Sequence, residues 1–476
     1  MLQSVRWCRR PRRWSGSAIS RERRADRGAT VRKPVPQAFF CSKVVLILLA
    51  FLAAAPAPAV TTSAKKTTKK TAHKRHIRVP VVYVSPIVRV AALRAISERT
   101  SQPAGVLAGA GALVPFFEQL AHPPENMSLH ILQYGDSHTA SDDWANQMRQ
   151  DFQAKFGAGG PGFTLPGHPF LGYRRFDSKG NNSRGWYTSG IVTRKNDGVD
   201  GLGGISLTSQ SAGQTVTLNV ECEQLELHYL RQPGGGQMDF LVDDSPVETI
   251  DTDGDSGPGV YSYTASPGPH EYMLRTLSSA PVRLFGWVAQ NHAGVTYETL
   301  GINGAQANLL LEWNPDILAP ELMSRDPALI VLAYGTNEAL SRSWTAEQYR
   351  ASLTQIIERL RAAVPVASIL LIGPPDCEYR TRGRRLPFPN LDQVIEIQRD
   401  VAQANGCAFW DWRAAMGGPG SVRQWLQAGL GQGDYTHLTG AGYRMAGGML
   451  FDELMAQYNR FLTVRAEGSH SQKDGQ

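Results

Sequence analysis

The segment LHILQYGDSH, residues 129–138, decides the fold class, because it joins a short apolar run directly to a tight polar turn. The run from Leu129 to Tyr134 predicts a buried strand that ends at Gly135. The segment after it, 142–156, carries large apolar residues at successive spacings of four: Trp144, Met148, Phe152 and Phe156. This spacing predicts a helix with one buried face. Strand, turn and helix in this order are the opening unit of an α/β fold.

The same alternation returns in the second half of the chain. Apolar runs predict strands over 329–334, 368–372 and 407–412, and longer amphipathic stretches predict helices over 346–363, 391–404 and 439–461. An apolar helix-like stretch also leads from 104 to 120. Alternating strands and helices predict a three-layer α/β/α sandwich around a parallel sheet, of the flavodoxin-like kind.

Between these parts, apolar and polar residues alternate with period two, as in Val216, Leu218 and Val220. This pattern, with Gly, Asp and Pro at the turns, predicts an antiparallel β-sandwich or jelly roll. A crossover to the next parallel strand needs only about 30 residues, but the next α/β element begins near Val295. The sequence therefore predicts a β domain at 165–290, inserted between hydrolase-domain parts at 101–164 and 291–462, with a disordered tail at 463–476.

The positive charge is concentrated at the N-terminal end. Residues 1–59 carry twelve Lys or Arg against Glu22 and Asp26, and residues 60–78 carry seven more without an acid. Because the whole chain has a net charge of only +7, the remainder is acidic, which argues against a nucleic-acid partner. We interpret 60–100 as a basic disordered linker.

The apolar run VVLILLAFLAAAP from Val44, followed by Ala57-Pro-Ala59, is typical of a secretory signal peptide. We therefore expect export to the periplasm or cell envelope, with 1–59 as a cleaved signal or alternatively an uncleaved membrane anchor. After its removal Cys222, Cys377 and Cys407 remain; a Cys377–Cys407 bridge and small buried thiols are both open, and we favour the second.

Three short motifs follow or close the predicted α/β strands: GDSH from Gly135, GTNE from Gly335 and DYTH from Asp434. Ligands of an open parallel sheet bind at the carboxyl ends of the strands, so these motifs should meet there. Each motif alone is a weak signal, because a turn or a helix cap reads the same way. Their joint occurrence in this order is a strong one.

The residue types complement one another chemically. Ser137 needs a base to become a nucleophile; His437 can accept its proton, and Asp434 can orient the imidazole. The backbone N–H groups of Ser137 and Gly304 and the side-chain amide of Asn337 can form an oxyanion hole. We therefore predict a catalytic triad with three oxyanion donors.

These motifs resemble the four blocks of the SGNH/GDSL hydrolase superfamily, at Ser137, Gly304, Asn337 and His437. The stretches GDSHTASDDW, GAGGPGFTLPG, GVTYETLGINGAQA and LIVLAYGTNEA resemble more closely its peptidoglycan O-acetylesterases, which carry a carbohydrate-binding-module-like β domain between the first two blocks. The resemblance covers about residues 105–460. His138 stands where the GDSL name has Leu, as in these esterases, and Glu338 stands where many members have Asp; we expect neither to impair catalysis.

The resemblance implies removal of O-acetyl groups from N-acetylmuramoyl residues of peptidoglycan, through an acetyl-Ser137 intermediate. Two alternatives stay open: an O-acetyltransferase acting on an envelope polysaccharide, and a non-catalytic glycan-binding envelope protein. The expected partner is an O-acetylated envelope glycan, and the acyl chain length and oligomeric state are not predicted.

We expect no cofactor and no metal, since no Cys/His cluster has zinc spacing. The Asp pairs at 142–143 and 243–244 are interpreted as solvated surface, and the glycine-rich 157–162 as a loop near the pocket mouth. His138 is expected to be structural or to line the pocket. Four tryptophans could stack on sugars but are more simply core: Trp186, Trp287, Trp410 and Trp412.

Overall fold

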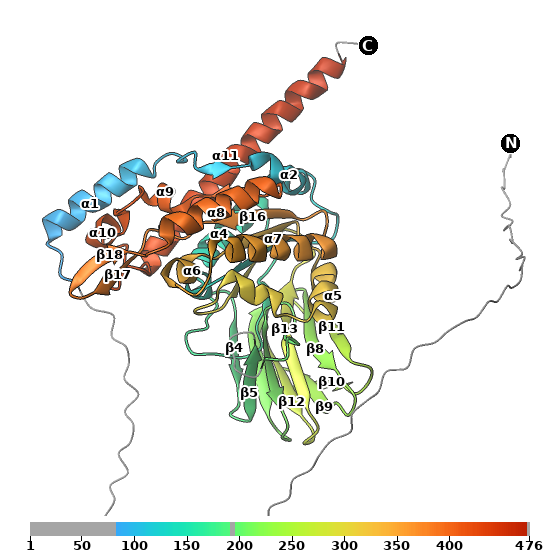
Figure 1. Ribbon diagram of the computed structural model, residues 1–476. Coiled ribbons are helices and arrows are strands. Elements are labelled where there is room, and N and C mark those ends of the chain that lie inside the picture. Colours follow the sequence, from blue (N-terminus) through green and yellow to red (C-terminus); the bar gives the residue numbers. More distant parts are fainter. Residues whose placement is uncertain (1–81, 191–195, 474–476) are drawn as a thin grey trace, which may run out of the picture. The chain divides into compact units, whose positions relative to one another are not determined.

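The computed structural model describes residues 82–190 and 196–473 (Figure 1). The predicted signal segment and residues 60–81 of the predicted linker lie outside the described residues. Within the described part, no helix is both long and apolar enough to cross a membrane.

A six-stranded sheet forms the centre of the α/β part, with the spatial order β1-β19-β16-β15-β2-β14. The bounds of these strands, in that order, are Leu107–Ala108, Ala408–Trp410, Ser368–Ile372, Leu329–Ala333, Leu129–Gly135 and Val295–Gly301. All neighbours pair in parallel except β1, which pairs antiparallel with β19. The five parallel strands have the flavodoxin-like order, so the predicted fold class is confirmed.

Successive side chains of these strands are apolar on both faces of the sheet, and helices cover both faces (Figure 1). On one face Leu132, Ile330 and Leu371 pack with the long helices α5 (Pro315–Arg325), α7 (Ala346–Ala363) and α8 (Leu391–Ala404). On the other face Ile131 and Val331 pack with α2 (Val114–Ala121), α4 (Asp143–Phe156) and α11 (Gly440–Lys473). The remaining helical segments are shorter or peripheral: α1 (Pro86–Arg99), η1 (Ala110–Leu113), α3 (Ser137–Ala140), η2 (Ala307–Leu311), α6 (Thr336–Leu340), α9 (Trp412–Met416) and α10 (Ser421–Gln427).

The segment between β2 and β14 contains two antiparallel sheets that enclose a separate apolar core. One sheet has the order β10-β9-β12-β7-β4, with bounds Ser245–Asp251, Gln237–Val242, Pro269–Thr276, Thr215–Glu221 and Lys179–Asn182. The other has the order β11-β8-β13-β6-β5, with bounds Gly257–Thr264, Gln224–Arg231, Val282–Gln290, Ile205–Ser209 and Trp186–Gly190, and β3 (Gly162–Thr164) pairs with β13. This is the expected β-sandwich insertion. A last hairpin, β17 (Glu378–Thr381) and β18 (Arg384–Pro387), belongs to the α/β part.

Two predicted disordered segments are wrong where the structure describes them. Residues 86–99 of the predicted linker form α1, which starts at the cap residue Ser85 and buries Ala92 and Ile96. The predicted tail from 463 is helical up to Lys473, as the last part of α11. Composition misled the prediction in both places, because α1 buries only two side chains and residues 463–473 continue a helix whose preceding part is packed.

The glycine-rich segment 157–162 also lies elsewhere than predicted. Val295 at the start of β14 accepts from Gly159 and donates to Gly157, so the segment sits at the amino ends of the strands, opposite the carboxyl edge. A Cβ at Gly159 would come 2.6 Å from the Val295 carbonyl carbon, which explains a glycine there.

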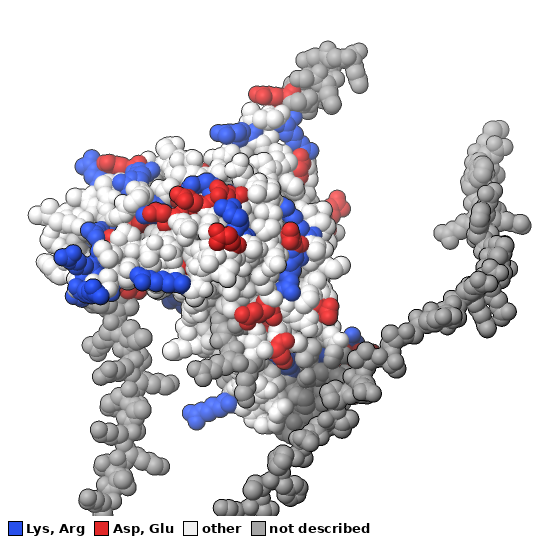
Figure 2. Space-filling model, viewed as in Figure 1, with Lys and Arg blue, Asp and Glu red and all other residues white. Residues whose placement is uncertain are grey.

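Lys and Arg side chains are interspersed with Asp and Glu over the face shown in Figure 2. The four tryptophans assigned to the core, Trp186, Trp287, Trp410 and Trp412, are buried, which confirms that prediction. Cys222, Cys377 and Cys407 are free and buried, so the Cys377–Cys407 bridge is not formed.

Candidate active site

The three motifs meet at the carboxyl edge of the parallel sheet, beside the point where its strand order reverses. The next parallel strand along the chain, β14, pairs with one edge of β2, and the strand after it, β15, pairs with the other edge. Ser137 follows β2 and Asn337 follows β15, so both flank this switch point, where open α/β sheets bind ligands.

In the turn after β2, Ser137 is half-buried, whereas its neighbours Asp136 and His138 are buried. Asp136 caps α3 by accepting the His138 N–H at 2.9 Å. A Cβ at Gly135 would come 2.2 Å from Thr139 Oγ1 and 2.8 Å from the Ala333 carbonyl oxygen, so only glycine fits between β15 and α3. Ser137 is the first residue of α3, where the backbone N–H has no acceptor within the helix.

Ser137, His437 and Asp434 form a continuous hydrogen-bonded chain. Ser137 Oγ lies 2.9 Å from His437 Nε2, and His437 Nδ1 lies 2.8 Å from Asp434 Oδ2. The Asp434 carboxylate accepts from Nδ1–H, which leaves Nε2 as the acceptor for the serine proton. The arrangement of nucleophile, base and orienting carboxylate is that of a serine-hydrolase triad.

The same contacts set the protonation of the pair. Burial alone would raise the pKa of Asp434, but hydrogen bonds from His437 and Thr436 lower it to about 2. Burial works against charge on His437, but the hydrogen bond and the charge of Asp434 raise its pKa above the ordinary 6.5. Asp434 is therefore ionised at neutral pH and stabilises a proton on His437 during a reaction.

A neighbouring hairpin supports the loop that carries Asp434 and His437. Tyr435 adopts a left-handed φ of 64°, and the Arg385 guanidinium lies 3.4 Å from the centre of its ring. Arg385 also donates to the carbonyl oxygens of Gly433 (3.1 Å) and Asp434 (3.4 Å). The hairpin therefore holds the two residues that precede Tyr435, and the Glu378 N–H also donates to the Tyr435 carbonyl oxygen at 2.9 Å.

The predicted oxyanion donors lie on loops that contact one another. Asn337 Nδ2 donates to the Ala305 carbonyl oxygen at 2.9 Å and lies 3.4 Å from Asp136 Oδ2. Gly304 is exposed, has a φ of +77° and has open space where a Cβ would stand. The Asn337 amide is thus fixed next to the Gly304 loop.

Glu338, which stands where many members of the superfamily have Asp, connects two loops of the site. Its buried carboxylate accepts the N–H groups of Ala307 at 2.7 Å and Gly335 at 3.1 Å. It therefore ties the loop after Gly304 to the loop before Asn337. Burial raises the pKa of Glu338 to about 7.

His138 joins the turn at Ser137 to the helix that follows His437. Its Nδ1 lies 2.8 Å from the hydroxyl of Tyr443 in the first turns of α11, and its ring centre lies 5.2 Å from that of His437. Burial lowers the pKa of His138, so a neutral ring lies beside His437. Sequence reasoning missed Tyr443, because no motif or period marks it.

The prediction that Asp142 and Asp143 are solvated is wrong. Asp142 is fully buried and accepts from Arg149 (3.0 Å) and Thr299 (2.5 Å), and Asp143 pairs with Arg174. Asp142 also accepts the Phe176 N–H at 2.9 Å, so it links α4 to the start of the inserted segment. Buried carboxylates need such partners. Across the described residues no group of three or more His, Cys, Asp or Glu could hold a metal ion.

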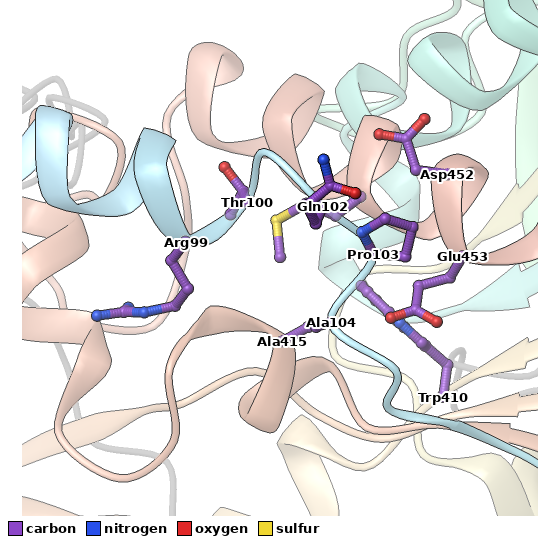
Figure 3. A pocket seen from close by; sticks show the side chains of 10 residues that line it. Arg99, Thr100, Gln102, Pro103, Ala104, Trp410, Ala415, Asp452 and Glu453 are labelled. Carbon is purple, nitrogen blue, oxygen red and sulfur yellow. The ribbon is translucent and has the colours of Figure 1, made fainter. Parts of the chain in front are cut away.

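The pocket in Figure 3 is separate from this site. It lies between the segment after α1, the short helix α9 and α11, and its lining includes Arg99, Trp410 and Glu453. Its volume of about 10 Å³ matches a single water molecule. Glu453 accepts the N–H groups of Gly105 (2.5 Å) and Val106 (3.3 Å), so this pocket belongs to the docking of the N-terminal segment.

The fold and the geometry of the site together match those of serine hydrolases built on a flavodoxin-like sheet. The model of the GDSL-like lipase/acylhydrolase family matches residues 261–445, which contain Gly304, Asn337, Asp434 and His437. Ser137 lies before this match because the inserted β domain separates it from the other blocks. No curated protein sequence matches the chain significantly.

Among solved structures, a peptidoglycan O-acetylesterase is 28% identical with a TM-score of 0.65, and the match covers 75% of this chain and 100% of that one. A family two carbohydrate esterase from Clostridium thermocellum is 13% identical over 57% of this chain and 98% of that one, with a TM-score of 0.27. The family model and this structural match both support an esterase of the SGNH hydrolase superfamily.

Proposed function

We propose that this esterase removes O-acetyl groups from peptidoglycan, with Ser137 as nucleophile, His437 as general base and acid, and Asp434 as the residue that orients the imidazole. The observation that carries the proposal is the chain of 2.9 and 2.8 Å contacts from Ser137 to Asp434. The similarity to a peptidoglycan O-acetylesterase over three quarters of the chain supports the substrate. We also propose a location in the cell envelope, because this substrate lies there and because the signal segment predicted at 1–59 supports export.

In the first half-reaction, Ser137 Oγ attacks the acetyl carbonyl carbon while its proton moves to His437 Nε2. The tetrahedral oxyanion accepts hydrogen bonds from the Ser137 and Gly304 N–H groups and from Asn337 Nδ2, which gives up its long 3.4 Å contact with Asp136 for it. When the intermediate collapses, the bond to the sugar oxygen breaks, and that oxygen takes the proton from His437. The free sugar hydroxyl leaves and acetyl-Ser137 remains.

In the second half-reaction, a water molecule gives its proton to His437 and attacks the acetyl-Ser137 carbonyl carbon. Collapse of the second tetrahedral intermediate returns the proton from His437 to Ser137 Oγ and releases acetic acid, which ionises at neutral pH. The triad thus ends in its starting protonation state.

The test is release of acetate from O-acetylated peptidoglycan, compared with the same cell wall after chemical deacetylation. We expect acetate only from the first sample, and none with Ser137→Ala. Unchanged activity in that variant would refute the assigned nucleophile. Acetylated glycan acceptor in place of free acetate would show a transferase, and glycan binding without turnover of any short acyl ester would show a binding protein.

A further inference from the structure

A polar cavity of about 230 Å³ lies at the start of the inserted segment, outside the triad. Its wall includes three buried hydroxyl-bearing residues and four basic ones, and no acidic residue lines it: Thr164, Tyr173, Ser178, His168, Arg174, Arg175 and Lys179. Basic groups and hydroxyls without carboxylates are the donors that an anion requires.

The wall of this cavity is attached to the catalytic loops. Arg174 Nε donates to the carbonyl oxygen of Ser141, which caps the short helix that begins at Ser137. From the same segment, the carbonyl oxygen of Leu171 lies 3.4 Å from Nδ2 of Asn303, the neighbour of Gly304. The segment that lines the cavity therefore contacts both the nucleophile helix and the oxyanion loop.

Charges around the cavity do not balance. The three carboxylates of Asp142, Asp143 and Asp177 are each paired with arginines of this region: Arg149, Arg174, Arg175 and, at 3.8 Å from Asp143, Arg444. Lys179 is exposed and forms no ion pair among the described residues. Of these charged groups only Arg174, Arg175 and Lys179 line the cavity, and both arginines are ion-paired, so Lys179 supplies the unpaired positive charge there.

We propose that this cavity binds a carboxylate of the substrate, so that the enzyme prefers O-acetylated glycans with an acidic substituent near the acetylated sugar. The inference rests on the proposed function, which places an acetylated glycan at Ser137. Lys179 supplies the unpaired charge, and the ion-paired Arg174 and Arg175 hold the wall in place. The carboxylate can come from a peptide attached to the glycan or from a uronic acid in the glycan itself.

The direct test measures binding, which is independent of turnover. The probes are a muramoyl dipeptide, its amidated neutral analogue and a hexuronate disaccharide, titrated into the Ser137→Ala protein by calorimetry. We expect the free dipeptide acid to bind about fivefold to tenfold more tightly than the amide, as for one partly exposed charge-assisted contact. Lys179→Gln should abolish this difference, and Lys155→Gln, an exposed lysine on α4 that does not line the cavity, should keep it.

Equal affinity for acid and amide, or an unchanged difference in Lys179→Gln, would overturn the inference. Tighter binding of the hexuronate than of the dipeptide would assign the carboxylate to the glycan chain instead of a peptide. In turnover, Lys179→Gln should raise KM about fivefold on peptide-bearing acetylated glycan and leave p-nitrophenyl acetate unaffected. If the wild type binds the acid selectively but releases no acetate from any glycan, the proposed function fails and the anion site stands.

Discussion

Replacing Asp434 by Asn tests the orientation of the catalytic histidine with little change of shape. Asp434 Oδ1 accepts the N–H groups of Thr436 and His437, both at 3.0 Å, and Oδ2 accepts from His437 Nδ1. An asparagine keeps its single oxygen for the two backbone donors, so its NH₂ group faces Nδ1. Nδ1 must then act as an acceptor, and the ring proton moves to Nε2, which faces Ser137.

A proton on Nε2 prevents His437 from accepting the serine proton, so the variant loses its general base. The same tautomer error in a serine protease triad lowers kcat by about 10⁴, and we expect a loss of about 10³ to 10⁴ here. The assay is p-nitrophenyl acetate hydrolysis, with thermal unfolding as the control for folding. Because the two backbone hydrogen bonds persist, we expect Tm to change by only a few degrees.

Retention of more than a tenth of wild-type kcat by a folded Asp434→Asn protein would refute this reasoning. Asp434→Ala provides the comparison, because it removes the acceptor for the two backbone donors as well. It should lose stability in addition to activity, by about 1–3 kcal/mol for each donor that stays buried and unpaired. Similar Tm values for the two variants would show that the loop does not depend on those bonds.

Three further predictions concern groups around the triad. Because Asp434 raises the pKa of His437 and the reaction needs the neutral ring, kcat/KM should rise with pH through a midpoint above 6.5, measured with a neutral ester. Glu338→Gln keeps one of the two buried acceptor oxygens and Glu338→Ala keeps neither, so kcat and the free energy of unfolding should fall in Glu338→Gln and fall further in Glu338→Ala. Because the pKa of Glu338 in the folded protein, about 7, exceeds the ordinary 4.5, the stability of the wild type should fall as the pH rises from about 4.5 to 7. This pH dependence should vanish in Glu338→Gln. Tyr443→Phe and His138→Leu should each lower kcat about tenfold at unchanged KM, because each removes the bond between the two side chains. Two control variants should keep kcat: His138→Asn, which retains an acceptor near Nδ1, and Tyr458→Phe, since the hydroxyl of this α11 tyrosine has no hydrogen bond among the described residues. Equal losses in all four variants would contradict a positioning role.

Local patterns were sufficient to predict the parts of the site that lie on strand ends. The run before Gly135 and the run before Gly335 each end a buried parallel strand, so topology alone brought Ser137 and Asn337 to one edge. The inserted β domain was predictable for the same reason, because its period-two pattern differs from that of the surrounding chain. Both predictions depend only on residues that are close together in the sequence.

Contacts between distant loops leave no such signal. Tyr443 reaches His138 across 305 residues, and Glu338 reaches the Ala307 N–H across 31, through side-chain geometry that no period encodes. Asp142 was assigned to the surface because acidic pairs usually are, but its partner Thr299 lies 157 residues away. The strand predicted over 407–412 stops at Trp410 because Asp411 caps α9 with its side chain, a competition between cap and strand that composition does not settle.

These cross-loop contacts explain how a site assembled from four separated loops stays organised before substrate binds. Asn337 and Glu338 bond to the Gly304 loop, His138 bonds to the helix after His437, and Arg385 holds the loop that carries Asp434. Each contact joins two of the loops or fixes one of them to a neighbouring hairpin. Because donors aimed in advance at a developing charge need no reorganisation during the reaction, the loop-to-loop bonds should contribute to kcat more than to substrate affinity. The kcat-against-KM split in the Glu338 and Tyr443 variants measures that contribution directly.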